Sequence, residues 1–586
     1  MSSQHPIHTE MTKCRDCYKC VRECPVKAIQ VMNEVANIIA DRCIFCGNCV
    51  NVCPVGAKKL RGDLSRVKAL IRQKERVIVS LAPSFITEFK GLEEGKIIRA
   101  LKKLGFWAVS ETALGAQEVS KACAAEMDKN EARAYISTAC PTVVELIRRY
   151  RPEYIPHLMP LSSPVLAHCK LLKKEFGDDI GIVMVSPCIA KKLEADSNPN
   201  LMNAAITFAG VRKWMEESGI NPFEETPDDS DVFVPRRSKD GSLYPIDGGM
   251  AQSIAHHAKN KNIKYMAFSG IQHLQESIRG LDEIGLKHCL FLELLACEGG
   301  CVNGPKAADN GGTALKWLSV EGYADQPGPG DKIPIGLDLS MPTNASPPPG
   351  KAHTPAEITE ALRRVGKLSQ ADEINCSGCG YDSCRQFAEA LLENRAEPSM
   401  CVSYMRNIAM NKANALIRSM PAGVALVDEH MSIIECNRRF AEIISDDTLE
   451  IFDVNPGMSG ASLKKIAPEL SAHFARGLEA GALDLRKDVR FGDRLLRLTI
   501  FTVENEHIVG GFLQDITEPA VQREQIIQKA HDVIHKNVAT VQQIAFLLGE
   551  NAAETEIMLN SLTASFQLEQ STPGGNALDQ DSNHAR

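Results

Sequence analysis

Short apolar runs separated by amphipathic stretches dominate the first half of the chain. Residues 77–81 and 182–185 are almost wholly apolar, which is the pattern of buried strands. Helical patterns lie between such runs from about residue 64 to residue 320, and one of them covers residues 114–127. Strands that alternate with helices predict an α/β core with parallel strands, in which ligands bind at the strand ends.

Apolar residues follow a helical period in the C-terminal part of the chain. Between residues 519 and 568 apolar side chains recur every three or four positions, and Gly549 separates two such helices. The longer stripe consists of Ile527, Ala530, Ile534, Val538, Val541, Ala545 and Leu548. Two helices per chain suit a homodimeric four-helix bundle, so this segment is predicted to serve dimerisation and output. The polar tail, residues 569–586, is predicted to be disordered.

Two further regions lie between these patterns. Residues 323–370 include two Pro- and Gly-rich runs, 326–330 and 346–350, which predict a linker. Residues 412–518 return to strand-like and helical runs, with a strand and a helix over 433–440 and strands over 495–501 and 508–514. The sequence therefore predicts a multidomain protein, as a length of 586 residues also suggests.

Composition narrows the classes of function. The net charge of −8 gives no electrostatic reason to bind nucleic acid. No apolar run approaches the roughly 20 residues that a membrane-spanning helix needs. The polar N-terminus lacks the apolar stretch of a signal peptide, so a cytoplasmic protein is predicted. Cysteines stay reduced there, and closely spaced cysteines then indicate metal sites rather than disulfides.

The first 62 residues carry two copies of the spacing C-x2-C-x2-C-x3-C-P. In two-cluster ferredoxins of this spacing, the fourth cysteine of each run binds the other cluster. The resemblance implies one [4Fe-4S] cluster on Cys14, Cys17, Cys20 and Cys53, and another on Cys24, Cys43, Cys46 and Cys49. Two structural zinc knuckles are the alternative, but tetrahedral zinc sites do not require the repeated spacing. Two adjacent clusters would conduct electrons.

A third cysteine set follows the predicted linker. It consists of Cys376, Cys379, Cys384 and Cys401. The spacing resembles that of a small four-cysteine [4Fe-4S] domain found in several anaerobic iron–sulfur proteins, here placed at residues 371–408. Zinc is again the alternative. The cysteine-rich surroundings favour iron and sulfur.

Three separated runs contain the cysteines that decide the function. They are Thr138-Ala139-Cys140-Pro141, Pro187-Cys188 through Glu194, and Glu293 through Cys301. In order and content they resemble the three signature runs of the [FeFe]-hydrogenases and place that domain at residues 63–322. The resemblance implies a [4Fe-4S] cluster on Cys140, Cys188, Cys297 and Cys301. It also implies that Cys301 bridges to a di-iron unit with CO, cyanide and a dithiolate bridge, which completes the H-cluster.

The same resemblance assigns residues around the di-iron unit. Lys191 matches the family lysine that reaches one cyanide, and the run at Pro83 and Ser84 matches the one that binds the other. Glu194 and Glu293 match the family acids beside these ligands. Taken alone, a lysine is usually solvated and a Ser-Pro pair usually forms a turn. A rival within the superfamily is an iron–sulfur assembly protein that keeps the cubane and lacks the di-iron unit. Lys191 and the intact second run favour the H-cluster.

One position departs from the fast enzymes of the family. They carry Cys-Cys-Pro in the first run, and its first cysteine passes protons to the di-iron unit. Here that position is Ala139, whose methyl group cannot relay a proton. We therefore expect slow hydrogen turnover. The remaining cysteines, Cys123, Cys169, Cys289 and Cys436, are predicted to be small buried hydrophobic side chains.

Residues 412–518 resemble a PAS domain, for which no ligand can be named. The whole arrangement resembles the sensory, PAS-bearing group of [FeFe]-hydrogenases. It implies a hydrogen sensor with low activity in hydrogen oxidation and proton reduction, a redox partner such as ferredoxin, dedicated maturation proteins, and a downstream kinase, phosphatase or regulator. An ordinary ferredoxin-linked hydrogenase and a non-catalytic electron-transfer or assembly protein are the other readings. His531 and His535 on the output helix are predicted to be surface residues, not phosphoacceptors.

Overall fold

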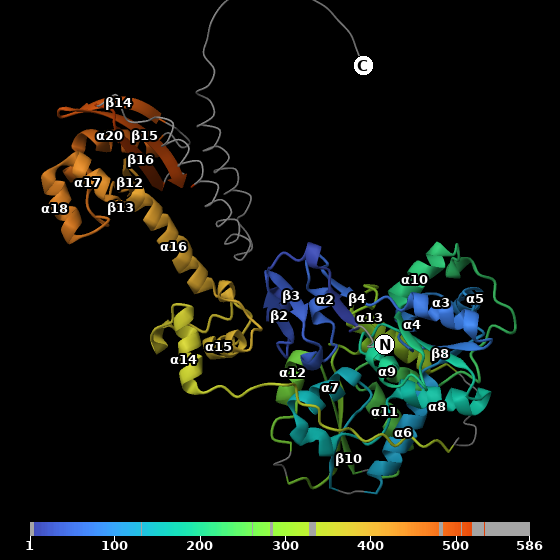
Figure 1. Cartoon of the computed structure of the whole chain (residues 1–586). Coiled ribbons are helices and arrows are strands. Elements are labelled where there is room, and N and C mark those ends of the chain that lie inside the picture. Colours follow the sequence, from blue (N-terminus) through green and yellow to red (C-terminus); the bar gives the residue numbers. More distant parts are fainter. Residues whose placement is uncertain are drawn as a thin grey trace, which may run out of the picture. The chain divides into compact units, whose positions relative to one another are not determined.

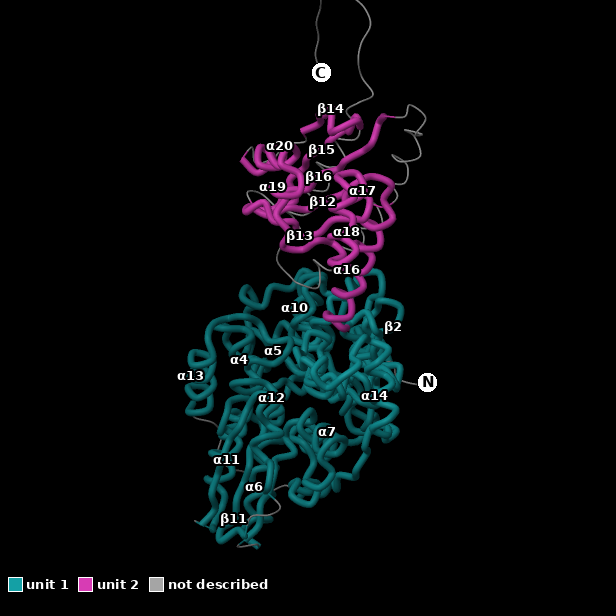
Figure 2. Tube along the Cα trace, turned by 90° about the vertical axis from the view of Figure 1, so that its left-hand side faces the viewer, with its two compact units in different colours: residues 1–400 teal, residues 401–586 magenta. Residues whose placement is uncertain are grey.

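The computed structural model describes residues 5–129, 132–260, 262–281, 285–326, 336–479, 485–504 and 507–517, together with residue 533. The chain divides into two compact units, Met1–Met400 and Cys401–Arg586, which Figure 2 shows in different colours. The boundary falls inside the range predicted for the four-cysteine domain. Each unit is described by itself.

The N-terminal part of the first unit is built from two similar halves. Each half places a one-turn helix within a cysteine run, α1 (Lys19–Arg22) or α2 (Asn48–Asn51). Two small antiparallel sheets flank them, formed by β1 (Ile7–Thr9) with β4 (Lys58–Leu60) and by β2 (Ile29–Met32) with β3 (Val35–Ile38). These short elements bury Val21, Ile29, Val31 and Ile44, and buried cysteines such as Cys20 and Cys49 lie in the same region.

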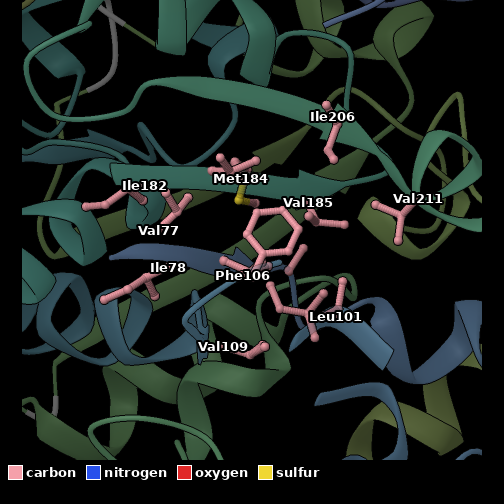
Figure 3. Close-up of a cluster of buried hydrophobic side chains, with 14 of the residues drawn as sticks. Val77, Ile78, Leu101, Phe106, Val109, Ile182, Met184, Val185, Ile206 and Val211 are labelled. Carbon is pink, nitrogen blue, oxygen red and sulfur yellow. The ribbon is translucent and has the colours of Figure 1, made fainter. Parts of the chain in front are cut away.

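A four-stranded parallel sheet forms the core of the following region. Its strand order is β6-β5-β8-β9, and all three strand pairs are parallel. The strands are β5 (Val77–Leu81), β6 (Ala108–Glu111), β8 (Gly181–Ser186) and β9 (Ala204–Thr207). Helices α3 (Leu64–Gln73), α5 (Glu94–Lys103), α8 (Pro164–Phe176) and α10 (Phe208–Glu217) add apolar side chains to the cluster drawn in Figure 3. The predicted strands and the α/β class are confirmed.

A second parallel sheet lies in the same region, with the order β10-β11-β7. Its strands are β7 (Ala134–Ile136), β10 (Ile263–Ser269) and β11 (Cys289–Leu295). Helices α6 (Ala113–Met127) and α11 (Gly249–His257) share a buried cluster with β7 and β11, and Figure 1 shows these two helices beside each other. The predicted helix over 114–127 corresponds to α6.

The range predicted as a linker contains a helix, α14 (Pro355–Arg364). Thr354 caps it in a reciprocal pairing with Glu357, and Pro355 occupies its first position. Ile358 and Leu362 contact Ala388 of α15 (Cys384–Leu392) in a small core. The predicted linker is therefore shorter than residues 323–370, because a capped helix begins at Pro355, shortly after the second Pro-rich run.

The second unit begins with the long helix α16 (Val402–Ser419), which leads into a five-stranded antiparallel sheet. The sheet order is β13-β12-β16-β15-β14. Its strands are β12 (Gly423–Asp428), β13 (Ile433–Cys436), β14 (Leu485–Phe491), β15 (Arg494–Glu504) and β16 (Ile508–Asp515). Four helices join β13 to β14, namely α17 (Arg438–Ile444), α18 (Asp446–Val454), α19 (Leu463–Ile466) and α20 (Pro468–Glu479). The strand and the helix predicted over 433–440 correspond to β13 and the start of α17, and the strands predicted at 495–501 and 508–514 lie within β15 and β16.

Two predictions fall outside the described residues. They are the dimerising helices over 519–568, with His531 and His535, and the disordered tail over 569–586. In the ranges that the structure describes, no helix has the length and apolar character needed to cross a membrane.

Candidate active site: a thiol-lined cavity

A cavity of about 590 Å³, including its opening to solvent, lies where the strands of the larger sheet end. Six of the residues predicted for the site line it: Pro83, Ser84, Ala139, Cys188, Lys191 and Cys301. The remaining walls are mainly apolar and come from Ala82, Thr112, Ala113, Ala116, Pro164, Val165, Met184, Ser186, Pro187, Tyr244, Pro245 and Leu295. The three separated cysteine runs thus meet around one enclosed space.

Parallel strands bring these residues together. Pro83 and Ser84 follow β5, and Cys188 follows β8, so both runs emerge at the same edge of the sheet. Cys140 is the residue before α7 (Pro141–Tyr150), in the segment that follows β7. Cys297 follows β11, and Cys301 begins the short helix η6 (Cys301–Asn303). The α/β topology therefore collects residues that are more than 150 positions apart in the sequence.

The four thiols predicted to hold the cubane share one environment. Burial raises the pKa of Cys301, and the nearby Cys140 and Cys188 thiolates raise it further. Cys297 likewise has the thiolates of Cys301, Cys188 and Cys140 near it. Four half-buried thiols gathered this closely would repel one another as thiolates, and soft iron supplies the positive partner that they need. The donor set therefore fits a cluster. In the described part of the chain, no three His, Cys, Asp or Glu side chains form a group that could hold a single metal ion.

Lys191 brings a buried positive charge to the cavity. Burial opposes this charge, but the carboxylate of Glu194 and the Cys188 thiolate outweigh it and raise the pKa of Lys191. Its Nζ lies 2.5 Å from Oε2 of Glu194, and Glu194 also accepts a hydrogen bond from Ser163. The ammonium group is thus fixed in the charged state that would stabilise an anionic cofactor. Glu194 acts through Lys191 and does not itself line the cavity.

Two buried polar atoms at the site have no hydrogen-bond partner in the described residues. They are the Ser84 hydroxyl oxygen and Oε1 of Glu293. Ser84 lines the cavity, so its free hydroxyl fits the predicted role of donating to a bound ligand. Burial raises the pKa of Glu293 to about 7, although its other oxygen accepts a 2.9 Å hydrogen bond from the Ala251 N–H group. Glu293 does not itself line the cavity.

Ala139, the position predicted to lack a relay thiol, lines the cavity. Its N–H group donates to the Ser137 hydroxyl at 3.1 Å. Cys123, on α6, is fully buried in the neighbouring apolar cluster with Val119 and Tyr135. Cys169 and Cys289 are also fully buried, and Cys436 nearly so. All four therefore occupy the apolar environments predicted for them.

The structure brings together each cysteine set of the N-terminal region as its spacing implies. Burial raises the pKa of Cys20 to about 11, and the nearby Cys17, Cys14 and Cys53 thiolates contribute. The thiolates near Cys49 are those of Cys46, Cys43 and Cys24. These last four thiols also line a cavity of about 320 Å³. The fourth cysteine of each run thus lies with the other run, and the space between the thiols fits a cluster.

One cysteine set of this region lies beside the active-site cavity. The Cys46 thiolate is near enough to affect the pKa of Cys297. At Gly47 the backbone has a φ of +84°, and a Cβ atom would stand 2.6 Å from Ile189 and 2.8 Å from Pro305. Glycine therefore permits this close approach.

The last cysteine set is divided between the two units. Cys376 is exposed, Cys379 half-buried, and Cys384 buried at the start of α15. Cys401 is buried and precedes α16 at the start of the second unit.

Tyr244 is one of the wall residues that sequence reasoning missed. It stands 105 positions after Ala139 and belongs to no recognisable metal-binding run, so only its contacts show its position.

Comparison with known families supports this description. Residues 75–305 match the family "Iron only hydrogenase large subunit, C-terminal domain". Residues 7–54 match a "4Fe-4S dicluster domain", and residues 372–403 match a family of Fe-S cluster domains.

Curated relatives share only part of the chain. Iron hydrogenase 1 of Clostridium pasteurianum is 27% identical over 298 residues, which are 41% of this chain and 52% of that protein. The chain thus spans about half the length of this relative. The periplasmic [Fe] hydrogenase large subunit of Nitratidesulfovibrio vulgaris is 24% identical, over 42% of this chain and 70% of that protein. The cytosolic Fe-S cluster assembly factor narfl of Danio rerio is also 24% identical, over 39% of this chain and 71% of that protein.

Solved structures are more distant. An [FeFe]-hydrogenase from Chlamydomonas reinhardtii has a TM-score of 0.35 and 16% identity, covering 49% of this chain and 91% of that one. The PAS domain of an HTR-like protein from Haloarcula marismortui has a TM-score of 0.15 and 19% identity, covering 19% and 93%. The family assignment rests instead on the sequence matches and the cavity. Residues 75–305 are therefore similar to the C-terminal domain of iron-only hydrogenase large subunits, and residues 7–54 and 372–403 are similar to iron–sulfur cluster domains.

Proposed function

We propose that the protein is a hydrogen-sensing [FeFe]-hydrogenase with slow turnover. The observation that carries this proposal is the cavity itself, in which Cys301, Lys191 and Ser84 are present but Ala139 replaces the relay thiol. When bound, the H-cluster supplies the metal chemistry that interconverts hydrogen with two protons and two electrons. The chain holds the cluster on Cys140, Cys188, Cys297 and Cys301.

The surrounding residues orient the di-iron unit and exclude water. Lys191 and Ser84 offer hydrogen bonds to its cyanide ligands, and such contacts set the orientation and potential of a metal site. The apolar wall limits water access. Electrons pass from the cluster held by Cys297 to the cluster held by Cys46, because these two cysteines lie near each other, and so enter the N-terminal two-cluster region. Dedicated maturation proteins assemble the di-iron unit, and a ferredoxin-like partner exchanges electrons with the outer cluster.

The output is assigned to the second unit. Its five-stranded antiparallel sheet with the helices between β13 and β14 supports a PAS domain, whose ligand we leave open. In this proposal a change of cluster redox state reaches the PAS domain through the four-cysteine domain, and the helices after residue 518 relay it within a homodimer. A kinase, phosphatase or regulator receives the signal in the cytoplasm.

An infrared spectrum of the matured protein, with and without hydrogen, tests the proposal. Bands of CO and cyanide that shift under hydrogen, together with slow turnover, are the expected result. Turnover as fast as that of ordinary hydrogenases would favour a ferredoxin-linked enzyme instead. Absent bands after maturation would favour the second candidate, a non-catalytic iron–sulfur protein, to which the match to the Danio rerio assembly factor points.

A truncation after Thr517 tests the output part of the proposal. The shortened protein is expected to keep its hydrogen-dependent bands and to become monomeric in size measurements. A truncated protein that stays fully dimeric would assign association to another surface.

A further inference from the structure

A chain of buried hydroxyl groups leads away from the active-site cavity. Tyr244 lines the cavity, and its hydroxyl oxygen lies 2.9 Å from Oγ of Ser120. Ser120 Oγ lies 2.7 Å from Oγ of Ser253. Both serines are fully buried, and Tyr244 is 8% exposed. Three hydroxyls therefore form a continuous hydrogen-bonded row in an otherwise apolar interior.

The row ends at ionisable groups near the surface. Ser253 donates a 3.0 Å hydrogen bond to Oδ2 of Asp240, and Nε2 of His257 lies 3.2 Å from the same oxygen without the geometry of a hydrogen bond. Gln117 holds the other oxygen of Asp240 at 2.9 Å. The exposed fraction of the side chain rises from 15% at Asp240 to 23% at His257 and 67% at His256. The row thus connects the cavity wall with solvent.

Helical geometry explains how the row begins at the cavity. Ala116 of α6 lines the cavity, and Ser120 lies one turn later on the same face of that helix. Ser253 and His257 are likewise one turn apart on α11. Asp240 and Tyr244 lie at the two ends of the short helix η5 (Asp240–Leu243). Three elements therefore fix the spacing of the row.

We propose that Tyr244, Ser120, Ser253, Asp240 and His257 form a proton relay that serves the cavity in place of the thiol missing at Ala139. The inference rests on the proposed function. Each hydroxyl accepts one proton while it releases its own, so the relay consumes nothing. During hydrogen oxidation the protons leave through Asp240 and His257 to solvent, and the electrons leave through the cysteine sets. During proton reduction the protons and the electrons move along the same routes toward the cavity.

A second hydroxyl chain provides an internal comparison. Thr112 also lines the cavity and lies 2.7 Å from Ser80, which in turn lies 2.8 Å from Nδ1 of His168. Nε2 of His168 lies 2.8 Å from Ser110. All of these side chains are buried, and within the described residues this chain ends at the Ser110 hydroxyl. A chain without an outlet cannot deliver protons.

The test compares Tyr244→Phe and Ser253→Ala with the control Ser110→Ala in the matured full-length protein. Each of the first two removes one relay hydroxyl and is expected to lower hydrogen turnover by about 10²-fold, the usual contribution of a positioned proton-transfer group. The double variant should fall no further, since one break already interrupts a row. The Ser110→Ala variant should keep the parent rate.

A second readout separates proton delivery from a loss of structure. Under hydrogen, the CO and cyanide bands should settle after a pH jump about 10²-fold more slowly in Tyr244→Phe and Ser253→Ala, with unchanged final positions. Parent-like rates in the two variants, with complete bands, would overturn the relay. An equal loss in Ser110→Ala would also overturn it. A parent protein without any CO or cyanide bands would overturn the proposed function, and the relay with it.

Discussion

The active-site region of the first unit and the sheet domain of the second unit are built around different interiors. The first gathers half-buried thiols, the Lys191 ammonium group and unpaired polar atoms around a cavity. The second closes about twenty apolar side chains into one core. Its buried Asn437 has all four amide hydrogen bonds satisfied, to Val424, Phe440, Ile417 and Ala422.

This difference shows which part of the chain depends on metal. Buried polar groups without partners cost free energy until something binds them, whereas a satisfied amide in an apolar core stabilises the fold at once. The first unit should therefore reach its full stability only when loaded, and the second should fold regardless of iron. The following predictions would break or sharpen this contrast, from the largest expected effect to the smallest.

Replacing the bridging thiol should have the largest effect. In Cys301→Ser, a hard oxygen replaces soft sulfur, so we expect the CO and cyanide bands and all hydrogen turnover to be lost. Cys169→Ala is the matched control, because Cys169 is fully buried in the same unit and does not line the cavity. Infrared spectra decide the matter, and intact bands in Cys301→Ser would contradict the ligand assignment.

Withholding iron should affect the stability of the two units differently. Thiolate clusters couple binding to folding, so residues 5–62 should lose most of their protection from hydrogen exchange in iron-free protein. Residues 423–515 should keep their protection, since their core consists of apolar side chains and its packing does not depend on iron. Mass spectrometry of exchanged peptides measures both regions in one sample. Equal loss of protection in the two regions would refute the contrast.

Acid should destabilise the first unit through His168. Burial lowers the pKa of this fully buried residue to about 3, below the 6.5 of an unfolded histidine. Its contribution to stability is complete above pH 6.5 and is lost as the pH falls from 6.5 toward 3, by up to about 4 kcal/mol. Denaturant melts followed by tryptophan fluorescence report this unit alone, because Trp107, Trp214 and Trp317 all lie in it. His168→Gln should flatten the pH dependence, and an unchanged slope would assign it to other groups.

Asn437→Ala should weaken the second unit. Removing the amide takes the acceptor from the buried Val424 N–H group and the donor from the carbonyl groups of Ile417 and Ala422, at a cost of about 3 kcal/mol. Hydrogen exchange of residues 423–515 should rise, while the infrared bands of the first unit stay unchanged. Asp488→Ala, at an exposed pair with Arg497, serves as the control and should cost under about 1 kcal/mol.

Ala139→Cys should have the smallest effect. The new thiol restores one relay position beside the cavity, and we expect turnover to rise about fivefold, or about 1 kcal/mol in barrier height. The gain stays small because proton-transfer steps in one path are not additive. Rates are to be compared at equal band intensity. An unchanged rate would show that Ala139 does not limit turnover.

Sequence reasoning reached the parts of this molecule whose signals are local. The β5 strand follows from an apolar run, and the cysteine sets follow from their spacing. Tyr244 was missed because its role depends on contact with Ser120, which lies 124 positions away. Helix α14 was missed because the Pro-rich composition before it masked a local cap at Thr354. Tertiary contact, rather than residue type, determines such positions.

Gly47 bears on the speed of electron exchange. Electron tunnelling between cofactors falls steeply with the distance between them, and Gly47 lets the Cys46 loop lie against Ile189 and Pro305, beside the hydrogenase domain. Any larger side chain would push the loop outward and slow each tunnelling event. A residue with no side chain thus sets how closely two cysteine sets can approach each other, and with it the tunnelling rate between the clusters that they would hold.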